Sequence, residues 1–168
     1  MTFLLGLGVM LSEPLFTAAD DFKNFFNQFK LSPEQYWSCG MVLSEQARAV
    51  FASEYIMTFG LRPASNIAQR FADAVVDIFR RKLDAIEAPF TVALRRTSPA
   101  FDRWCVSQSG PIRCYAVFIY TDDPVFLVLG AERMARALRV WTVLCSDLGL
   151  MMAIAAKRQC GTHAEWLG

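Results

Sequence analysis

The chain has 168 residues, of which 54% are hydrophobic, including 14 phenylalanines, and its formal net charge is +1. This length and apolar content fit a single globular domain, residues 1–168, and exclude an intrinsically disordered chain. The near-zero charge gives no overall attraction to nucleic acid, so a nucleic-acid partner has to be argued from local residues.

The five cysteines are far apart in the sequence and form no C-x-x-C pair; they are Cys39, Cys105, Cys114, Cys145 and Cys160. An odd number at such spacings fits free, buried thiols in a reducing compartment rather than a disulfide framework. We therefore expect an intracellular protein, in the cytoplasm or the nucleus. His163 is the only histidine, and together with Cys160 it supplies too few ligands for zinc.

Residues 1–11 are apolar, but they are about half as long as the ~20 residues that cross a bilayer, and they lack the basic start of a signal peptide. No other segment offers about 18 uninterrupted apolar residues. We expect no membrane anchor, and we expect residues 1–11 to belong to the core.

The segment that follows predicts short elements. Residues 15–22 are typical of a strand, and residues 23–29 of a short helical turn that ends near Pro33. Residues 37–43 and 50–57 favour one or two further strands before the helix-breaking sequence at 60–63.

A long amphipathic helix is predicted over residues 65–85. Its apolar residues recur at steps of three and four, which are Ile67, Phe71, Val75, Ile78, Phe79 and Leu83. One face of this helix should pack against a sheet. Residues 87–110 are rich in proline and serine, and we expect a connection or a loop insertion there.

The second half of the chain predicts a hairpin, a helix and a strand. β-Branched and aromatic residues dominate 112–120 and 125–129, which a polar turn at 121–124 joins. Residues 131–148 carry a helical apolar stripe that Gly149 ends, and residues 150–156 again favour a strand. The order predicts an α+β fold, with helices packed on one face of a mostly antiparallel sheet.

Three acidic residues fall at the ends of predicted strands. Asp21 closes the first strand, and Asp122 and Asp123 lie at the hairpin tip. In an antiparallel sheet these ends can lie side by side, and neighbouring carboxylates repel each other unless a cation lies between them. Three such carboxylates suit two Mg²⁺ ions, which serve nucleotidyl transfer.

Simpler interpretations of the same residues remain open. Asp20 or Asp21 can cap the helical turn that follows, and Asp122, Asp123 and Pro124 can form an ordinary turn. By the same reasoning Phe26 can belong to the core, Gly60 can serve only as a helix breaker, and Lys157 can be a solvated charge.

Five segments, in order, resemble the palm of a reverse transcriptase. In the first, an aromatic residue follows Asp21 by five positions, and the third is a Tyr-x-Asp-Asp box. The segments are 21–31, 58–65 with its Phe-Gly-Leu sequence, 120–123, 148–150 with Lys157, and 166–168. The resemblance runs, with gaps, from about Leu15 to the last residue and is to retrotransposon enzymes of the long-terminal-repeat and tyrosine-recombinase kinds.

The resemblance implies a partial reverse transcriptase fold and a two-metal site. Asp21 and Asp122 would be the principal ligands of two Mg²⁺ ions, or of Mn²⁺ as a substitute. Asp123 would lie beside them, and the backbone carbonyl of Phe22 would add an oxygen. These are the hard oxygen donors that Mg²⁺ prefers.

The resemblance also implies substrate contacts. Phe26 would lie under the deoxyribose and reject a 2′-hydroxyl, which selects dNTP over rNTP and argues against a polymerase or cyclase that uses ribonucleotides. Lys157 would assist the departing pyrophosphate. Gly60, Arg62, Gln69 and Tyr120 would lie near template or triphosphate, and Trp166 and Gly168 would form the primer grip.

The implied partners are an RNA or DNA template with its primer, and dNTP. The fingers, thumb and RNase H segments of a parent polyprotein are expected to be largely missing from the chain. Pro124 stands where the family has an aliphatic residue, so we expect a turn that differs from the usual tight one. The alternative to a polymerase is an inactive transposon-derived remnant that keeps the palm fold.

Overall fold

The computed structural model describes residues 2–45, 48–53, 55–57, 64–153 and 158–162. Helices alternate with antiparallel strand pairs, so the predicted α+β class is confirmed. In chain order the elements are α1 (Thr2–Leu11), β1 (Leu15–Ala19), the 3₁₀ turns η1 (Phe25–Gln28) and η2 (Pro33–Cys39), β2 (Gly40–Glu45), β3 (Arg48–Ser53), α2 (Ala64–Thr97), α3 (Pro99–Val106), β4 (Tyr115–Tyr120), β5 (Asp123–Leu129), α4 (Ala131–Asp147) and β6 (Gln159–Gly161).

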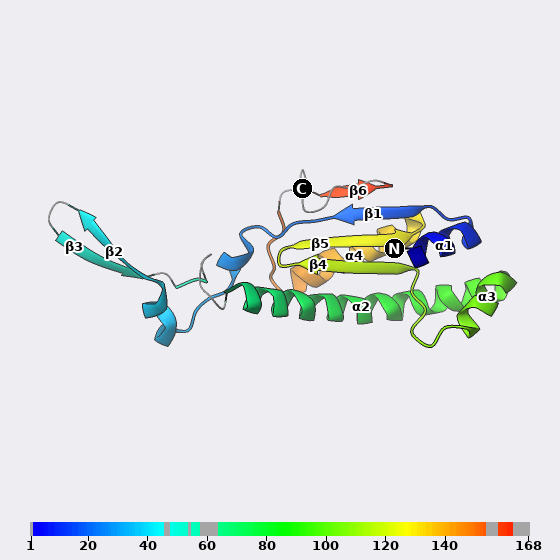
Figure 1. Ribbon diagram of the computed structural model, residues 1–168, viewed down its shortest axis with the longest axis horizontal. Helices are drawn as coiled ribbons and strands as arrows, with labels where there is room; N and C mark the ends of the chain where they lie inside the picture. Colours follow the sequence, from blue (N-terminus) through cyan, green and yellow to red (C-terminus); the bar gives the residue numbers. More distant parts are fainter. Residues whose placement is uncertain (1, 46–47, 54, 58–63, 154–157, 163–168) are drawn as a thin grey trace.

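The main sheet has the strand order β4-β5-β1-β6 (Figure 1). Each neighbouring pair is antiparallel, so β1 and β4 run parallel to each other with β5 between them. Together with α2 and α4, these strands follow the sequence strand, helix, strand, strand, helix, strand. This is the split βαβ arrangement, in which the hairpin's second strand inserts beside the first strand.

One face of the sheet packs on α2 and α4. Trp141 of α4 is fully buried and contacts the rings of Phe22, Phe79 and Phe126, at centroid distances of 5.7, 5.6 and 5.2 Å. Phe79 comes from the face of α2 that the apolar periodicity predicted, and Phe126 from β5. The aromatic cluster therefore joins both helices to the centre of the sheet.

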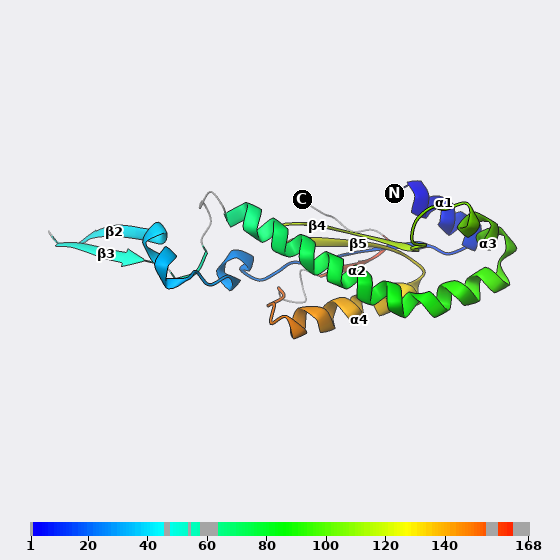
Figure 2. The same cartoon turned by 90° about the horizontal axis from the view of Figure 1, so that it is seen from below.

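The expectation that helices pack on one face only is wrong, because α1 and α3 cover one end of the other face of the sheet. Leu4 and Leu7 of α1 pack with Phe101 of α3 against Leu127 and Leu129 of β5. Figure 2 shows α1 on the side of the sheet opposite α4. The expectation that residues 1–11 contribute to the core is confirmed for this buried side of α1, and no helix among the described residues is long and apolar enough to cross a membrane.

The expectation of a loop or connection over residues 87–110 is wrong for most of that range and holds only for residues 107–110. Helix α2 continues to Thr97 through Pro89, and α3 follows after a single residue. The continuation is held by Glu87, whose buried carboxylate pairs with two arginines of α4. The α3 start has its own signal in the sequence, since the Ser98 hydroxyl accepts the Phe101 N–H and proline stands in the first turn.

Three other element predictions need correction. The strand predicted at 37–43 begins only at Gly40, because a 3₁₀ turn precedes it, and β2 and β3 form a hairpin outside the main sheet (Figure 1). The first strand ends at Ala19. Of the strand predicted at 150–156, Met152 forms a single bridge to Phe22, and residues 154–156 lie outside the described residues.

We predict that Phe79→Ala lowers the free energy of unfolding by about 3–5 kcal/mol, because it leaves a cavity where the two helices meet the sheet. Ile78, the preceding residue of α2, is 39% exposed and provides the matched control. Ile78→Ala should cost about 1 kcal/mol or less. Urea unfolding of the two variants measures the difference, and equal losses would contradict the packing described above.

Candidate functional site

The pairing of β1 with β5 continues beyond the end of β1. The Asp20 N–H donates to the Pro124 carbonyl at 3.1 Å, and the Phe22 N–H donates to the Asp122 carbonyl at 3.2 Å. The residue between two such bonds faces its partner in a non-hydrogen-bonded pair, where side chains come closest. Asp21 therefore lies directly opposite Asp123.

Asp21 and Asp123 point away from the helical layer. Ala18 and Phe22 belong to the core between the sheet and the helices, and side chains along a strand alternate between faces. The side chain of Asp21 thus lies on the other face, where α1 and α3 cover only the opposite end of the sheet. Two aromatic residues of β4, Phe118 and Tyr120, are 47% and 62% exposed.

Two carboxylates in direct cross-strand positions repel each other. A like-charged pair of this kind destabilises a sheet by up to about 1 kcal/mol, and a divalent cation between the two would reverse the sign of the interaction.

The turn that carries Asp122 has only two residues. Tyr120 pairs with Asp123, which leaves Thr121 and Asp122 at the tip. Thr121 has φ 55°, a left-handed conformation that is costly for a β-branched residue. Its N–H donates to the Gln69 side-chain oxygen at 2.8 Å, and this bond from α2 holds the turn in place.

Gln69 was predicted to contact template or triphosphate, but its amide is bonded within the chain. Besides accepting from Thr121, it donates to Asp73 at 2.9 Å and to the Ile119 carbonyl at 3.4 Å. Together with Arg80, which donates to the Val117 carbonyl at 2.9 Å, it caps carbonyls along the outer edge of β4. Here Gln69 supports the acidic turn from α2.

We expected Pro124 to make the turn differ from the usual tight one, but the turn has only two residues. Proline lies in β5 opposite Ile119, and the edge carbonyls of Val117 and Ile119 point toward α2. The hydrogen bonds between β4 and β5 in this part of the hairpin therefore come from Phe118 and Tyr120, and the missing N–H of proline falls outside them. The extended geometry that proline imposes on Asp123 fits the start of a strand.

Asp20 and Asp21 have different surroundings. The Asp20 side chain is buried and receives two bonds from Arg158, from Nε at 3.0 Å and from Nη2 at 2.5 Å. Burial raises the pKa of the nearby Cys145 thiol to about 12, and the negative charge of Asp20 adds to this shift. Asp20 thus lies on the helical side, and Asp21 is the acid that faces Asp123.

Two phenylalanines of the first motif lie in the core. The ring of Phe22 stacks on Phe25 at 4.9 Å, so only its backbone is available to a ligand. Phe26, the predicted sugar gate, is 5% exposed and packs edge-on against Phe25. Five other predicted site residues lie outside the described residues: Gly60, Arg62, Lys157, Trp166 and Gly168.

Within the described part of the chain, no group of three or more His, Cys, Asp and Glu side chains is arranged to hold a metal ion. The backbone pairing brings Asp21 and Asp123 together, and Asp122 lies beside them in the turn. All three supply the hard oxygen donors that Mg²⁺ and Mn²⁺ prefer. Their donor type suits a divalent cation, and in the described ranges the backbone pairing brings Asp21 and Asp123, but no third acid, opposite each other.

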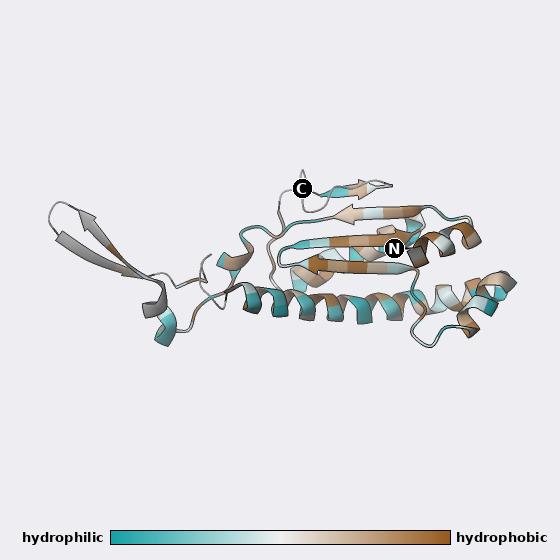
Figure 3. Ribbon diagram, viewed as in Figure 1, coloured by the Kyte–Doolittle hydropathy of each residue, from teal (hydrophilic) through white to brown (hydrophobic). Residues whose placement is uncertain are grey.

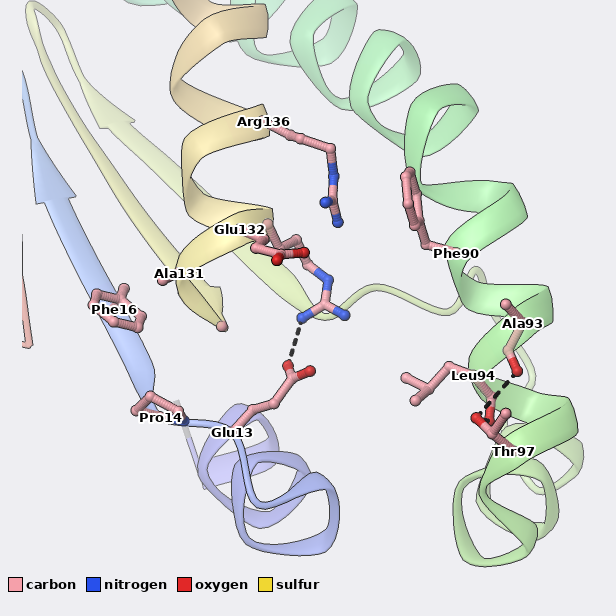
Figure 4. Close-up of a pocket in the computed structure, with 12 residues that line it drawn as sticks. Glu13, Pro14, Phe16, Phe90, Ala93, Leu94, Thr97, Ala131, Glu132 and Arg136 are labelled. Carbon is pink, nitrogen blue, oxygen red and sulfur yellow. Dashed lines mark hydrogen bonds and ion pairs between the residues drawn. The ribbon is translucent and has the colours of Figure 1, made fainter.

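A cavity of about 550 Å³ lies at the opposite end of the sheet, between the start of β1, the second half of α2 and the start of α4 (Figure 4). Glu13 binds Arg133 there at 2.7 Å, and Arg133 and Arg136 both bind Glu87. The guanidinium of Arg136 also lies over the Phe90 ring at 4.0 Å. The arginines are thus used within the fold, and the cavity is separate from the acids.

Sequence reasoning missed this ion-pair cluster. Glu87 continues the buried stripe of α2 four residues after Leu83 and eight after Phe79, and Figure 3 shows how the polar and apolar residues of α2 alternate. A charged residue on an apolar helical stripe indicates a buried ion pair. Because a loop was predicted over these residues, Glu87 was not recognised as part of the helical stripe.

No protein-family model matches the chain, and no curated protein matches it in sequence.

We predict opposite effects for two substitutions at the turn. Thr121→Gly should raise the free energy of unfolding by about 1 kcal/mol, because glycine adopts the left-handed conformation without the steric cost. Gln69→Ala should lower it by about 1 kcal/mol through loss of the bond to the Thr121 N–H. Denaturant unfolding measures both, and destabilisation by Thr121→Gly would show that the turn is not strained.

Proposed function

We propose that the chain is the palm of an RNA-directed DNA polymerase, which adds deoxynucleotides to a primer on a template. The observation that carries the proposal is the cross-strand pair of Asp21 and Asp123, with Asp122 in the adjoining two-residue turn. These acids belong to the first and third of the motifs that resemble a reverse transcriptase. The split βαβ order of the fold is compatible with a palm.

In this proposal, Asp21, Asp122 and Asp123 hold the divalent cations, together with the Phe22 carbonyl. Bound Mg²⁺ would supply activation of the attacking hydroxyl and stabilisation of the leaving phosphate. The chain's own contribution is to hold Asp21 and Asp123 on one face of the sheet, on strands that pack on the aromatic core. Metal-dependent catalysis requires a scaffold that holds the metal ligands in a fixed geometry.

An exposed aromatic residue beside the acids supports contact with a substrate. Tyr120 is directly opposite Asp123 on the same face of the sheet and is largely exposed, as a residue that contacts primer or nucleotide has to be. In this proposal Phe26 is the sugar gate, and its side chain is 5% exposed and packed in the core.

A second candidate function is an inactive remnant that keeps the fold and the acids. It is favoured by one observation, that no group of three metal-ligating side chains converges among the described residues. An inactive chain would keep the aromatic core and lose only the arrangement of the acids. The two candidates differ in a single measurable property, the incorporation of dNTP.

We predict that the full chain, supplied with Mg²⁺ or Mn²⁺ and a primed RNA template, incorporates dNTP, and that Asp122→Asn abolishes incorporation. Loss of one carboxylate removes a metal ligand while it conserves the shape of the turn. Asp147→Asn, at the exposed end of α4, is the matched control and should keep activity. Primer extension measures the three proteins, and no incorporation with either metal would favour the inactive remnant.

We also predict that Mn²⁺ stabilises the folded chain. A cation that binds only the folded state, at 100 times its dissociation constant, adds about 2.7 kcal/mol to the free energy of unfolding. Asp21→Asn and Asp123→Asn should each remove this gain, since each takes away one of the paired carboxylates. Thermal unfolding with Mn²⁺ and with EDTA provides the comparison, and an equal gain in the variants would place the cation elsewhere.

A further inference from the structure

Arg158 directly precedes β6, whose Gln159 pairs with Ala19. An ion pair joins Arg158 to Asp20, the residue that follows Ala19. The side chain of Asp20 is only 3% exposed, and that of Arg158 is 33% exposed. The ion pair therefore lies on the face of the sheet that packs on α2 and α4, just beyond the last residue pair between β1 and β6.

The Asp20 carboxylate links this ion pair to the next residue. One of its oxygens, Oδ2, accepts both bonds from Arg158, while Oδ1 accepts the Asp21 N–H at 3.1 Å. A continuous set of bonds thus runs from the guanidinium to the backbone of Asp21. Neighbouring side chains of an extended segment point to opposite faces. An Asp20 side chain fixed on the helical face of the sheet therefore keeps the Asp21 side chain on the opposite face.

A buried ion pair is a weak source of stability, because two apolar side chains of similar size stabilise a fold equally well or better. What the pair adds is a defined geometry, since both oxygens of one carboxylate are committed to specific donors. The backbone of Asp21 is otherwise held by the Asp20 and Phe22 bonds to the β5 side and by its own carbonyl, which accepts the Ala153 N–H at 2.8 Å.

We propose that Asp20 and Arg158 form a positioning pair that orients Asp21 toward Asp123, so that the affinity of the acids for a divalent cation depends on this ion pair on the helical face of the sheet. The inference rests on the proposed function, because it concerns the same acids. Neither Asp20 nor Arg158 touches the cation, and both act through the backbone of Asp21.

The first test compares Asp20→Asn with Asp84→Asn. Asp84 accepts a two-pronged ion pair from Arg113 between α2 and the residues before β4, so its loss matches that of Asp20 in chemistry. Mn²⁺ binding to the full chain is followed by electron paramagnetic resonance. We expect Asp20→Asn to weaken Mn²⁺ binding at least about tenfold, as loss of a ligand-orienting partner does, and Asp84→Asn to leave it unchanged.

A double variant, Asp20→Leu with Arg158→Leu, separates folding from positioning. It replaces the ion pair by an apolar contact that should preserve the fold, but it removes the bond to the Asp21 N–H. We expect a stable protein with weakened Mn²⁺ binding. Wild-type affinity in this variant or in folded Asp20→Asn would overturn the proposal.

A measurement without metal keeps the inference distinct from the proposed function. The ¹³C resonance of the Asp123 carboxylate is sensitive to its electrostatic surroundings, which include the Asp21 carboxylate, in the metal-free chain. We expect it to move in Asp20→Asn but not in Asp84→Asn. If the wild type bound no Mn²⁺, the proposed metal site would be wrong. The positioning role of Asp20 and Arg158 would then be tested by this resonance alone. An unmoved resonance in Asp20→Asn would overturn the positioning role.

Discussion

The arrangement of the acids depends on the antiparallel pairing of β1 with β5. Two backbone bonds, from Asp20 to Pro124 and from Phe22 to Asp122, carry this pairing past the end of β1 and bring Asp21 opposite Asp123. A shift of one residue in this register would send Asp21 into the helical core. The register is fixed by the aromatic cluster around Trp141, to which Phe22 and Phe126 contribute one residue from each side of the ladder.

The turn and the strand end are each held from a different direction. Gln69 reaches from α2 to the backbone of Thr121, and Arg158 reaches from the β6 segment to Asp20. Both supports are hydrogen bonds from side chains that lie outside the hairpin itself. The acids are therefore held by the whole βαββαβ unit, and a hairpin with the same sequence would not hold them alone.

Periodicity was sufficient for the elements that bury an apolar stripe or face. It predicted the first part of α2, the hairpin of β4 and β5, and α4. In each of these elements the apolar residues, such as Phe79, Val117 and Trp141, recur at the spacing of a helix or a strand. It failed over residues 87–110, where Pro89 suggested a break and the partners of Glu87 lie 46 and 49 residues further along the chain. The sequence could group Asp21 with the hairpin acids, because all of them fall at the ends of predicted strands. The specific pairing of Asp21 with Asp123 depends on the strand register, which the sequence does not give. The structural role of Gln69 depends on a contact with a residue 52 positions further along the chain.

We propose that Asp21 and Asp123 face each other on the side of the sheet away from α2 and α4 and share a divalent cation. A crystal structure of the full chain soaked in Mn²⁺, with anomalous diffraction recorded at the manganese edge, tests this most directly. We predict an anomalous peak between the two carboxylates, within about 2–2.6 Å of an oxygen from each. A structure in which the two side chains lie on opposite faces of the sheet, or in which manganese binds away from both, would contradict it.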